Sequence, residues 1–426
     1  MPETSATVSS TIQIRQLSCG MPLVVEPMPG VRTAAVSWLI PVGNATDPDG
    51  ADGDGWAGLL AELAQRGAGS RDSKSFSDAL DRAGVQRAVS PASVHMVVSG
   101  TTTGDRLDEA LALFADLVVR PHLPGDALDA VRSLALQQLE GLKDDPQHRV
   151  SLHLRERHLP APFNRSGYGH REALERATID DLRGDWSRRA RPRGSILAIA
   201  GAVDADHCAR RMDGLLAGWE GAAPDATVLR DPIGGLFHEP DTSNQTHLAI
   251  GLGAPSEKEP ESLLCRLATM ILGGESSSRL FTEVRERRGL CYAVNAGYAG
   301  GRDRGMVAVY AGSTPERAQE TFDTISAELE RFASGITPDE FRRAKVGLKS
   351  RLVMQGESTA ARAAAIGSDW YRLGRCRSLA ELSREVDEVS FERLNEWIAA
   401  AMGSAWRLSA TLCTVGKAPL SAPGVG

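Results

Sequence analysis

The sequence contains one series of secondary-structure patterns that occurs twice. A β-type run is followed by an amphipathic helical pattern, and then by a second helix that begins at or beside a proline. The first copy occupies residues 93–102, 106–114 and 124–139, and the second occupies residues 305–314, 316–322 and 337–344. Matched positions such as Arg106 and Arg317 lie 211 residues apart, close to half of the 426-residue chain. The sequence therefore predicts two related halves.

A stretch rich in proline and glycine separates the two halves. It includes Pro224, Pro232 and Pro240, which are typical of a linker. We predict an N-terminal domain at residues 1–222, a linker at 223–245 and a C-terminal domain at 246–426. Expected strands near the ends of each half lie at residues 11–26, 33–41 and 195–201, and at 247–253 and 407–415. Strand blocks with long helical stretches between them indicate an α+β fold, in which each half forms a mostly antiparallel sheet with helices packed on one face.

Charge, hydrophobicity and cysteine spacing limit the classes of protein to which this chain can belong. Lys and Arg number 48 against 55 Asp and Glu, so the net charge of −7 argues against a nucleic-acid partner. The most apolar early stretch, residues 34–42, is too short to span a bilayer, and the first ten residues lack the pattern of a secretory signal. The six cysteines include no Cys-x-x-Cys pair, which favours single thiols in a reducing compartment. We therefore expect a cytoplasmic protein with no membrane partner.

Residues 271–294 form the most distinctive segment of the chain. Gly273 and Gly274 interrupt a helix, serines 276–278 supply a cap for the next one over 279–288, and a strand-like alternation follows Gly289. The segment resembles the C-terminal-domain signature of the pitrilysin/insulinase family of zinc peptidases, which includes the mitochondrial processing peptidase. The resemblance extends over both halves, because subunits of that family consist of two homologous α+β domains that form one half of a clam-like peptidase.

The resemblance assigns a role to two side chains. In the family, an Arg and a Tyr seven positions apart bind the substrate across a closed chamber, and they match Arg285 and Tyr292. Arg offers several donors to a peptide carbonyl, and a Tyr hydroxyl donates to the oxyanion of peptide hydrolysis. The alternative is an Arg on a solvated helix face and a Tyr that fills a strand face. The surrounding glycines, serines and Arg-Gly-Leu-x-Tyr frame favour the substrate-binding role.

The family's zinc motif, by contrast, is altered. Family members carry His-x-x-Glu-His on the first long helix, where two His hold zinc and the Glu is the general base. In the matching helix at residues 55–67, Gly58 and Glu62 stand at the ligand positions and Ala61 at the base position. The third ligand is a Glu ahead of an Asp-x-Pro turn, where this chain has Gln137 and Gln138, and the spacing favours Gln138.

No other residues replace that zinc site. The nine His residues include no His-x-x-x-His pair, and Glu62 with Glu140 would supply only two carboxylates, a weak basis for zinc. The acidic run at residues 47–55 lacks the ligand spacing of a calcium loop and is expected to form an exposed turn. We therefore expect no metal and no other cofactor in this chain.

The Arg/Tyr pair is present and the zinc motif is altered, which together suggest that the chain acts with a second subunit. Some members of the family pair a zinc-bearing subunit with one that carries the Arg/Tyr pair. The resemblance implies that this chain is the zinc-lacking subunit of such a heterodimeric endopeptidase. It would be inactive alone, with zinc held by a homologous His-x-x-Glu-His partner and a peptide bound as an added strand on the partner's sheet. The alternative is a scaffold or peptide-binding subunit without a catalytic contribution, and a homodimer is also compatible with the sequence.

Overall fold

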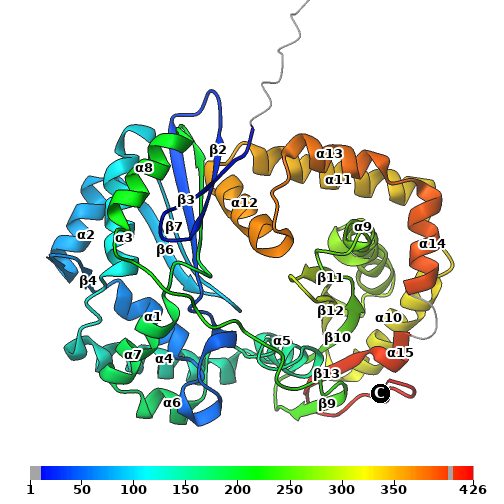
Figure 1. Ribbon diagram of the computed structural model, residues 1–426. Coiled ribbons are helices and arrows are strands. Elements are labelled where there is room, and N and C mark those ends of the chain that lie inside the picture. Colours follow the sequence, from blue (N-terminus) through cyan, green and yellow to red (C-terminus); the bar gives the residue numbers. More distant parts are fainter. Residues whose placement is uncertain (1–10, 402–405, 426) are drawn as a thin grey trace, which may run out of the picture. The chain divides into compact units, whose positions relative to one another are not determined.

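The computed structural model describes residues 11–401 and 406–425, and the expectation about the first ten residues lies outside them (Figure 1). The chain folds into two compact units that exchange segments along the sequence. The first unit contains residues 1–139, 165–228 and 353–381, and the second contains residues 140–164, 229–352 and 382–426. The division at 1–222, 223–245 and 246–426 concerns the related halves of the sequence and stays a prediction.

The first unit is built on a six-stranded sheet. Its strands, in spatial order, are β1 (Gln13–Gln16), β2 (Pro22–Pro27), β8 (Ile196–Gly201), β3 (Thr33–Ile40), β7 (Met96–Thr103) and β6 (Gln86–Pro91). Strands β2 and β8 are parallel, and the other neighbours are antiparallel. A short two-stranded sheet joins β4 (Gly67–Ala68) to β5 (Arg71–Asp72). Strand β6 lies at one edge of the larger sheet and pairs with β7.

The second unit repeats this pattern of pairings. Its strands, in spatial order, are β11 (Cys291–Gly300), β12 (Gly305–Ser313), β10 (Thr246–Ala254), β13 (Thr411–Gly416) and β9 (Gly235–Pro240). Strands β9 and β13 are parallel, and the other neighbours are antiparallel, as in the series from β2 to β6. The predicted α+β fold with two related sheets is therefore confirmed. One strand boundary was wrong, because Trp406–Ser409 forms a helical turn (α15) and β13 begins at Thr411.

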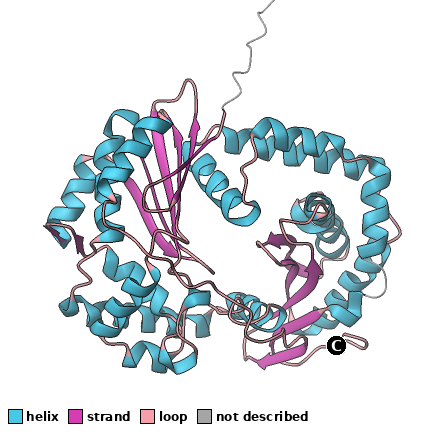
Figure 2. Cartoon of the chain, viewed as in Figure 1, coloured by secondary structure: helices cyan, strands magenta, loops and turns pink. Residues whose placement is uncertain are grey.

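Helices cover the sheets of both units (Figure 2). The helices of the first unit are α1 (Trp56–Ala64), α2 (Ser73–Arg82), α3 (Leu107–Val119), α4 (Leu128–Gly141), α6 (Arg171–Arg176), α7 (Ile179–Arg189), α8 (Ala205–Leu215) and α12 (Thr359–Leu373). Those of the second unit are α5 (Pro146–His158), α9 (Ser262–Thr269), α10 (Ala318–Phe332), α11 (Pro338–Gly356), α13 (Leu379–Glu388), α14 (Phe391–Ala401) and the turn α15. None of the described helices combines the length and apolar character needed to cross a bilayer.

Helix α12 packs on the second face of the sheet in the first unit, and helix α5 packs on the second face of the sheet in the second unit. In the first unit, Leu23 and Val25 face the main core, whereas Val24 between them packs against Ile366 of α12. In the second unit, Leu154 of α5 packs against the sheet in the same manner. Alternation along a strand directs neighbouring side chains to opposite faces, so nearly continuous apolar strands become buried on both sides. Each sheet therefore has helices of its own half on one face, as expected, and one helix from the other half on the second face.

Candidate functional site

The first unit positions helix α1 through a buried carboxylate. Asp47 accepts backbone N–H bonds from Gly55 and Ala57 at 3.1 and 3.0 Å, and it forms an ion pair with Arg189 at 2.9 Å. Burial raises the pKa of the Asp47 carboxyl to about 7, against the opposing effects of Arg189 and the two N–H groups. The expectation of an exposed acidic turn at residues 47–55 is therefore wrong for Asp47, because this carboxylate fixes the start of α1 inside the unit, and it is also wrong for Asp54, which is buried.

The degenerate metal positions surround one pocket. Gly58, Ala61 and Glu62 of α1 line it together with Gln138 of α4, and its volume is about 190 Å³. The remaining lining residues come from the edge strand β6, from α1 and the residue before it, from α4, and from residues 167–168: Gly55, Leu59, Val89, Ser90, Pro91, Val131, Leu134, Ala135, Gly167 and Tyr168. Gln137 is not among them. The structure thus brings together the four positions that the sequence placed at the altered site.

The side chains around this pocket do not fit zinc. They provide one carboxylate, from Glu62, and one amide, from Gln138, whereas a zinc site needs three or four His, Cys or carboxylate ligands. Across the described part of the chain, no group of three or more His, Cys, Asp or Glu is arranged to hold a metal ion. Glu140, the other carboxylate considered from the sequence, forms an ion pair with Lys143 at 2.6 Å and does not line the pocket. That the chain binds no zinc stays a prediction.

The Arg/Tyr segment lies in the second unit and contains an unusual helix. The chain leaves a π-helical turn, η6 (Met270–Gly274), and enters a second one, η7 (Phe281–Arg287), within the helix predicted over residues 279–288. Gly273 is required because a Cβ there would lie 2.5 Å from the backbone nitrogen of Ala296. Apolar periodicity predicts a helix but does not distinguish the α from the π form, and π turns are frequent at functional sites.

A β-bulge sets the direction of Tyr292. Cys291 pairs with Ser313 and Ala293 pairs with Gly312, so Tyr292 is the extra residue in β11. A bulge of this kind bends the strand and redirects a side chain. Tyr292 is 60% exposed, so it is not the tyrosine that fills a strand face, which was the alternative considered from the sequence.

Buried hydroxyls brace the turn that leads into this bulge. Ser313 Oγ donates to the carbonyl oxygen of Leu290 at 2.8 Å, and Thr321 Oγ1 lies 3.1 Å from Ser313 Oγ. Arg317 Nη1 donates to the carbonyl oxygen of Gly289 at 2.6 Å. Sequence reasoning missed these three residues as supports. The sequence did offer a signal for them. All three lie at the end of the repeated strand at residues 305–314 or shortly after it, and the predicted helix before that strand ends at Gly289.

We expect Ser313→Ala to lower the free energy of unfolding of the second unit by about 1–2 kcal/mol, because the buried Leu290 carbonyl loses its shorter hydrogen bond. Urea unfolding, followed by a probe in this unit, measures the loss. The matched control is Ser277→Ala, since Ser277 is exposed and should change stability by less than about 0.5 kcal/mol. Equal stability of the two variants would contradict the bracing role of Ser313.

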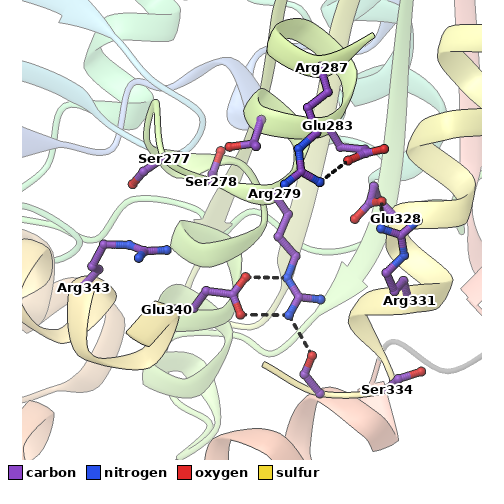
Figure 3. Close-up of a pocket in the computed structure, with 12 residues that line it drawn as sticks. Ser277, Ser278, Arg279, Glu283, Arg287, Glu328, Arg331, Ser334, Glu340 and Arg343 are labelled. Atoms are coloured by element: carbon purple, nitrogen blue, oxygen red, sulfur yellow. Dashed lines mark hydrogen bonds and ion pairs between the residues drawn. The ribbon is translucent and has the colours of Figure 1, made fainter. Parts of the chain in front are cut away.

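Arg285 differs from the other arginines of its segment. Arg279 bonds to both carboxylate oxygens of Glu340 at 2.7 and 2.9 Å (Figure 3). Both residues line a pocket of about 410 Å³. Arg287 and Arg288 both bond to Glu283, at 3.0 and 3.1 Å. The Arg285 guanidinium stacks on the Phe281 ring at 4.8 Å and makes no hydrogen bond or ion pair with any described residue.

The arrangement therefore presents two donors to solvent. Arg285 is exposed at the end of η7, and Tyr292 is exposed at the bulge that follows. The Tyr292 hydroxyl, like the Arg285 guanidinium, has no hydrogen-bond partner among the described residues. Both side chains belong to the second unit, whereas Gly58, Glu62 and Gln138 belong to the first.

Comparisons with known proteins identify the family of this chain. Residues 23–166 match the family model described as insulinase (peptidase family M16), and residues 176–348 match the model described as peptidase M16 inactive domain. An uncharacterized zinc protease of Mycobacterium leprae is 27% identical over 401 residues, which cover 92% of this chain and 90% of the relative. The uncharacterized zinc protease YmxG of Bacillus subtilis is 24% identical over 395 residues, which cover 90% and 94%.

Solved structures show the same fold. The chain is similar to a crystal structure of a peptidase M16 inactive domain from Pseudomonas fluorescens, with a TM-score of 0.85 and 20% identity over 97% of this chain and 99% of that one. A protease from Helicobacter pylori gives a TM-score of 0.87 and 18% identity over 96% and 100%. A chain of complex III2 from Candida albicans gives 0.80 and 17% over 96% of each chain. The two family models show that the chain belongs to the insulinase family of peptidases, family M16, and its sequence lacks the family's zinc motif.

Proposed function

We propose that this chain is the metal-free subunit of a two-subunit zinc endopeptidase, and that it contributes Arg285 and Tyr292 to a composite active site. The observation that carries the proposal is the pair of exposed, internally unpartnered donors on a braced turn. The other arginines of this segment form ion pairs with carboxylates, whereas the Arg285 guanidinium does not. This difference supports a ligand for Arg285 outside the chain. A homologous partner with His-x-x-Glu-His would hold zinc and supply the general base.

The two donors suit two stages of peptide hydrolysis. The planar Arg285 guanidinium offers several N–H groups to the carbonyls of an extended peptide, and it would hold the backbone in place. When water attacks the scissile carbonyl, negative charge develops on the carbonyl oxygen. The Tyr292 hydroxyl would donate a hydrogen bond to that oxygen, and this bond is stronger in the transition state than with the bound peptide.

The first unit explains why the chain would need a partner. Ala61 at the general-base position has no group that accepts a proton, and Gly58 has no side chain to ligate a metal. Glu62 and Gln138 alone do not make a zinc site. Peptide bond cleavage would therefore depend on the partner's residues, with this chain acting on substrate binding and on the oxyanion.

The direct test compares the purified chain, a His-x-x-Glu-His family member from the same organism, and their mixture. Zinc content by mass spectrometry and cleavage of a library of unstructured peptides are the two readouts. We expect the chain alone to cleave no peptide and to contain less than one zinc ion per chain. We expect the mixture to cleave peptides faster than the partner alone.

Two outcomes would contradict the proposal. Stoichiometric zinc or peptidase activity in the isolated chain would mean that a site exists outside the altered motif. A stable complex with no more activity than the partner alone would support the scaffold function instead. The likeness in fold to a chain of complex III2 makes that second function the natural alternative.

A further inference from the structure

The pocket at the altered zinc positions has its own chemistry. Its volume of about 190 Å³ is large enough to admit more than one water molecule. Leu59, Val131 and Leu134 supply apolar wall. Glu62 is the one charged residue among the side chains that line it, and neither Glu62 nor Gln138 makes a hydrogen bond or ion pair with any described residue. The pocket thus has apolar walls and one carboxylate that forms no ion pair with a described residue.

This combination matches a cation carried on an apolar stem. A carboxylate without an internal partner gains most from a charged donor, and charge-assisted hydrogen bonds are about twice as strong as neutral ones. The amide oxygen of Gln138 offers a second acceptor to the same group. The stem of a lysine or arginine side chain buries its methylene groups against apolar walls while its head reaches polar groups.

We propose that this pocket binds an alkylammonium or alkylguanidinium group, as carried by a lysine or arginine side chain or by a free amine. The site replaces the altered metal centre and lies within the first unit. It does not involve Arg285 or Tyr292, so it goes beyond the proposed function and holds or fails independently of the composite peptidase.

Three small ligands test the chemistry on the full chain. An acetylated, amidated pentapeptide with alanines around a central lysine is compared with the same peptide carrying norleucine, and with free pentylamine. Affinities come from NMR titration or calorimetry at low salt. We expect the lysine peptide to bind about tenfold more tightly than the norleucine peptide, the difference expected for one charge-assisted hydrogen bond. Pentylamine shows whether the peptide backbone adds to that affinity.

Two variants locate the site. Glu62→Gln should remove the preference for lysine over norleucine, whereas Glu140→Gln, at an exposed carboxylate paired with Lys143, should leave it unchanged. Gly58→Leu should block all three ligands by filling the pocket. A Cβ at Gly58 meets no atom closer than 4.0 Å, and a helical glycine is replaced without loss of stability, so this variant should fold.

The proposal is overturned by any of three results. These are equal binding of the lysine and norleucine peptides, a lysine preference that persists in Glu62→Gln, and no measurable binding of either lysine peptide or pentylamine. Loss of peptidase activity in the mixed complex has no bearing on it. Likewise, an Arg285 or Tyr292 variant that still binds amines would give no information about the proposed peptidase function, which is tested separately.

Discussion

Tyr292→Phe should reduce kcat of the assembled peptidase by about a hundredfold, with little change in subunit affinity. The substitution removes one hydroxyl and keeps the ring, so packing at the bulge is preserved. Loss of one oxyanion donor costs roughly 10²–10³ in kcat in other hydrolases. We place the effect at the lower end because the partner's zinc would share the developing charge. Steady-state cleavage of a fluorogenic peptide, with complex formation followed by analytical ultracentrifugation, measures both quantities.

A matched control separates catalysis from structure. Tyr298 lies on the same strand, and its hydroxyl donates to the carbonyl oxygen of Pro255 at 2.8 Å. Tyr298→Phe should lower stability by about 1 kcal/mol and leave kcat unchanged. If Tyr292→Phe proves as active as the wild type in a fully assembled complex, the hydroxyl has no role in turnover and the scaffold function gains support.

Arg285 should affect KM more than kcat. Its guanidinium is positioned by stacking on Phe281 and not by an ion pair, so it contributes to peptide binding before the reaction begins. Arg285→Gln should raise KM by about tenfold, which corresponds to one charged hydrogen bond. Arg287→Gln removes a neighbouring charge that already bonds to Glu283, and it should change KM by less than about twofold. Equal effects of the two variants would indicate a general charge effect.

The sequence predicted the repeated sheets because strand alternation and helix periodicity are local patterns. Both copies carry the same order of elements, and the structure confirms it in the pairing of β3 with β7 and of β10 with β12. The degenerate metal positions were also predictable as neighbours, since Gly58 and Glu62 lie one helical turn apart. Gln138 comes from a distant helix, and its place at the same pocket was inferred from family resemblance.

Other features depend on long-range contacts that local patterns do not encode. Helix α12 has small and apolar residues on one side, such as Ala363 and Ile366, which predict a packed helix but not the sheet on which it packs. The bulge at Tyr292 arises from pairing between two strands, and residues 290–298 alternate as a regular strand would. Burial of Asp47 likewise depends on Arg189, which is far away in the sequence.

The buried ion pair that joins α12 to the sheet of the first unit should contribute strongly to the stability of that unit. Arg362 of α12 and Glu26 of β2 are 2% and 1% exposed, and they pair at 2.8 Å. Arg362→Met would remove the Arg362 guanidinium from the buried Glu26 carboxylate. Removal of one member of a buried ion pair costs about 3–5 kcal/mol, compared with 0–1 kcal/mol for an exposed pair. We therefore expect Arg362→Met to destabilise this unit far more than the removal of a charge from an exposed ion pair does.

The double variant Glu26→Leu/Arg362→Met shows whether the loss comes from the buried Glu26 charge once Arg362 is removed. Apolar replacement of a whole buried pair is often neutral or stabilising, so the double variant should recover most of the stability that Arg362→Met loses. Arg106→Met is the exposed control, because Arg106 and Glu109 are about half exposed and pair at 2.7 Å. Hydrogen exchange of β2 and α12 reports on this unit directly, which matters because two units need not unfold in one step. If the double variant is as unstable as Arg362→Met, shape complementarity rather than charge pairing holds α12 on its sheet.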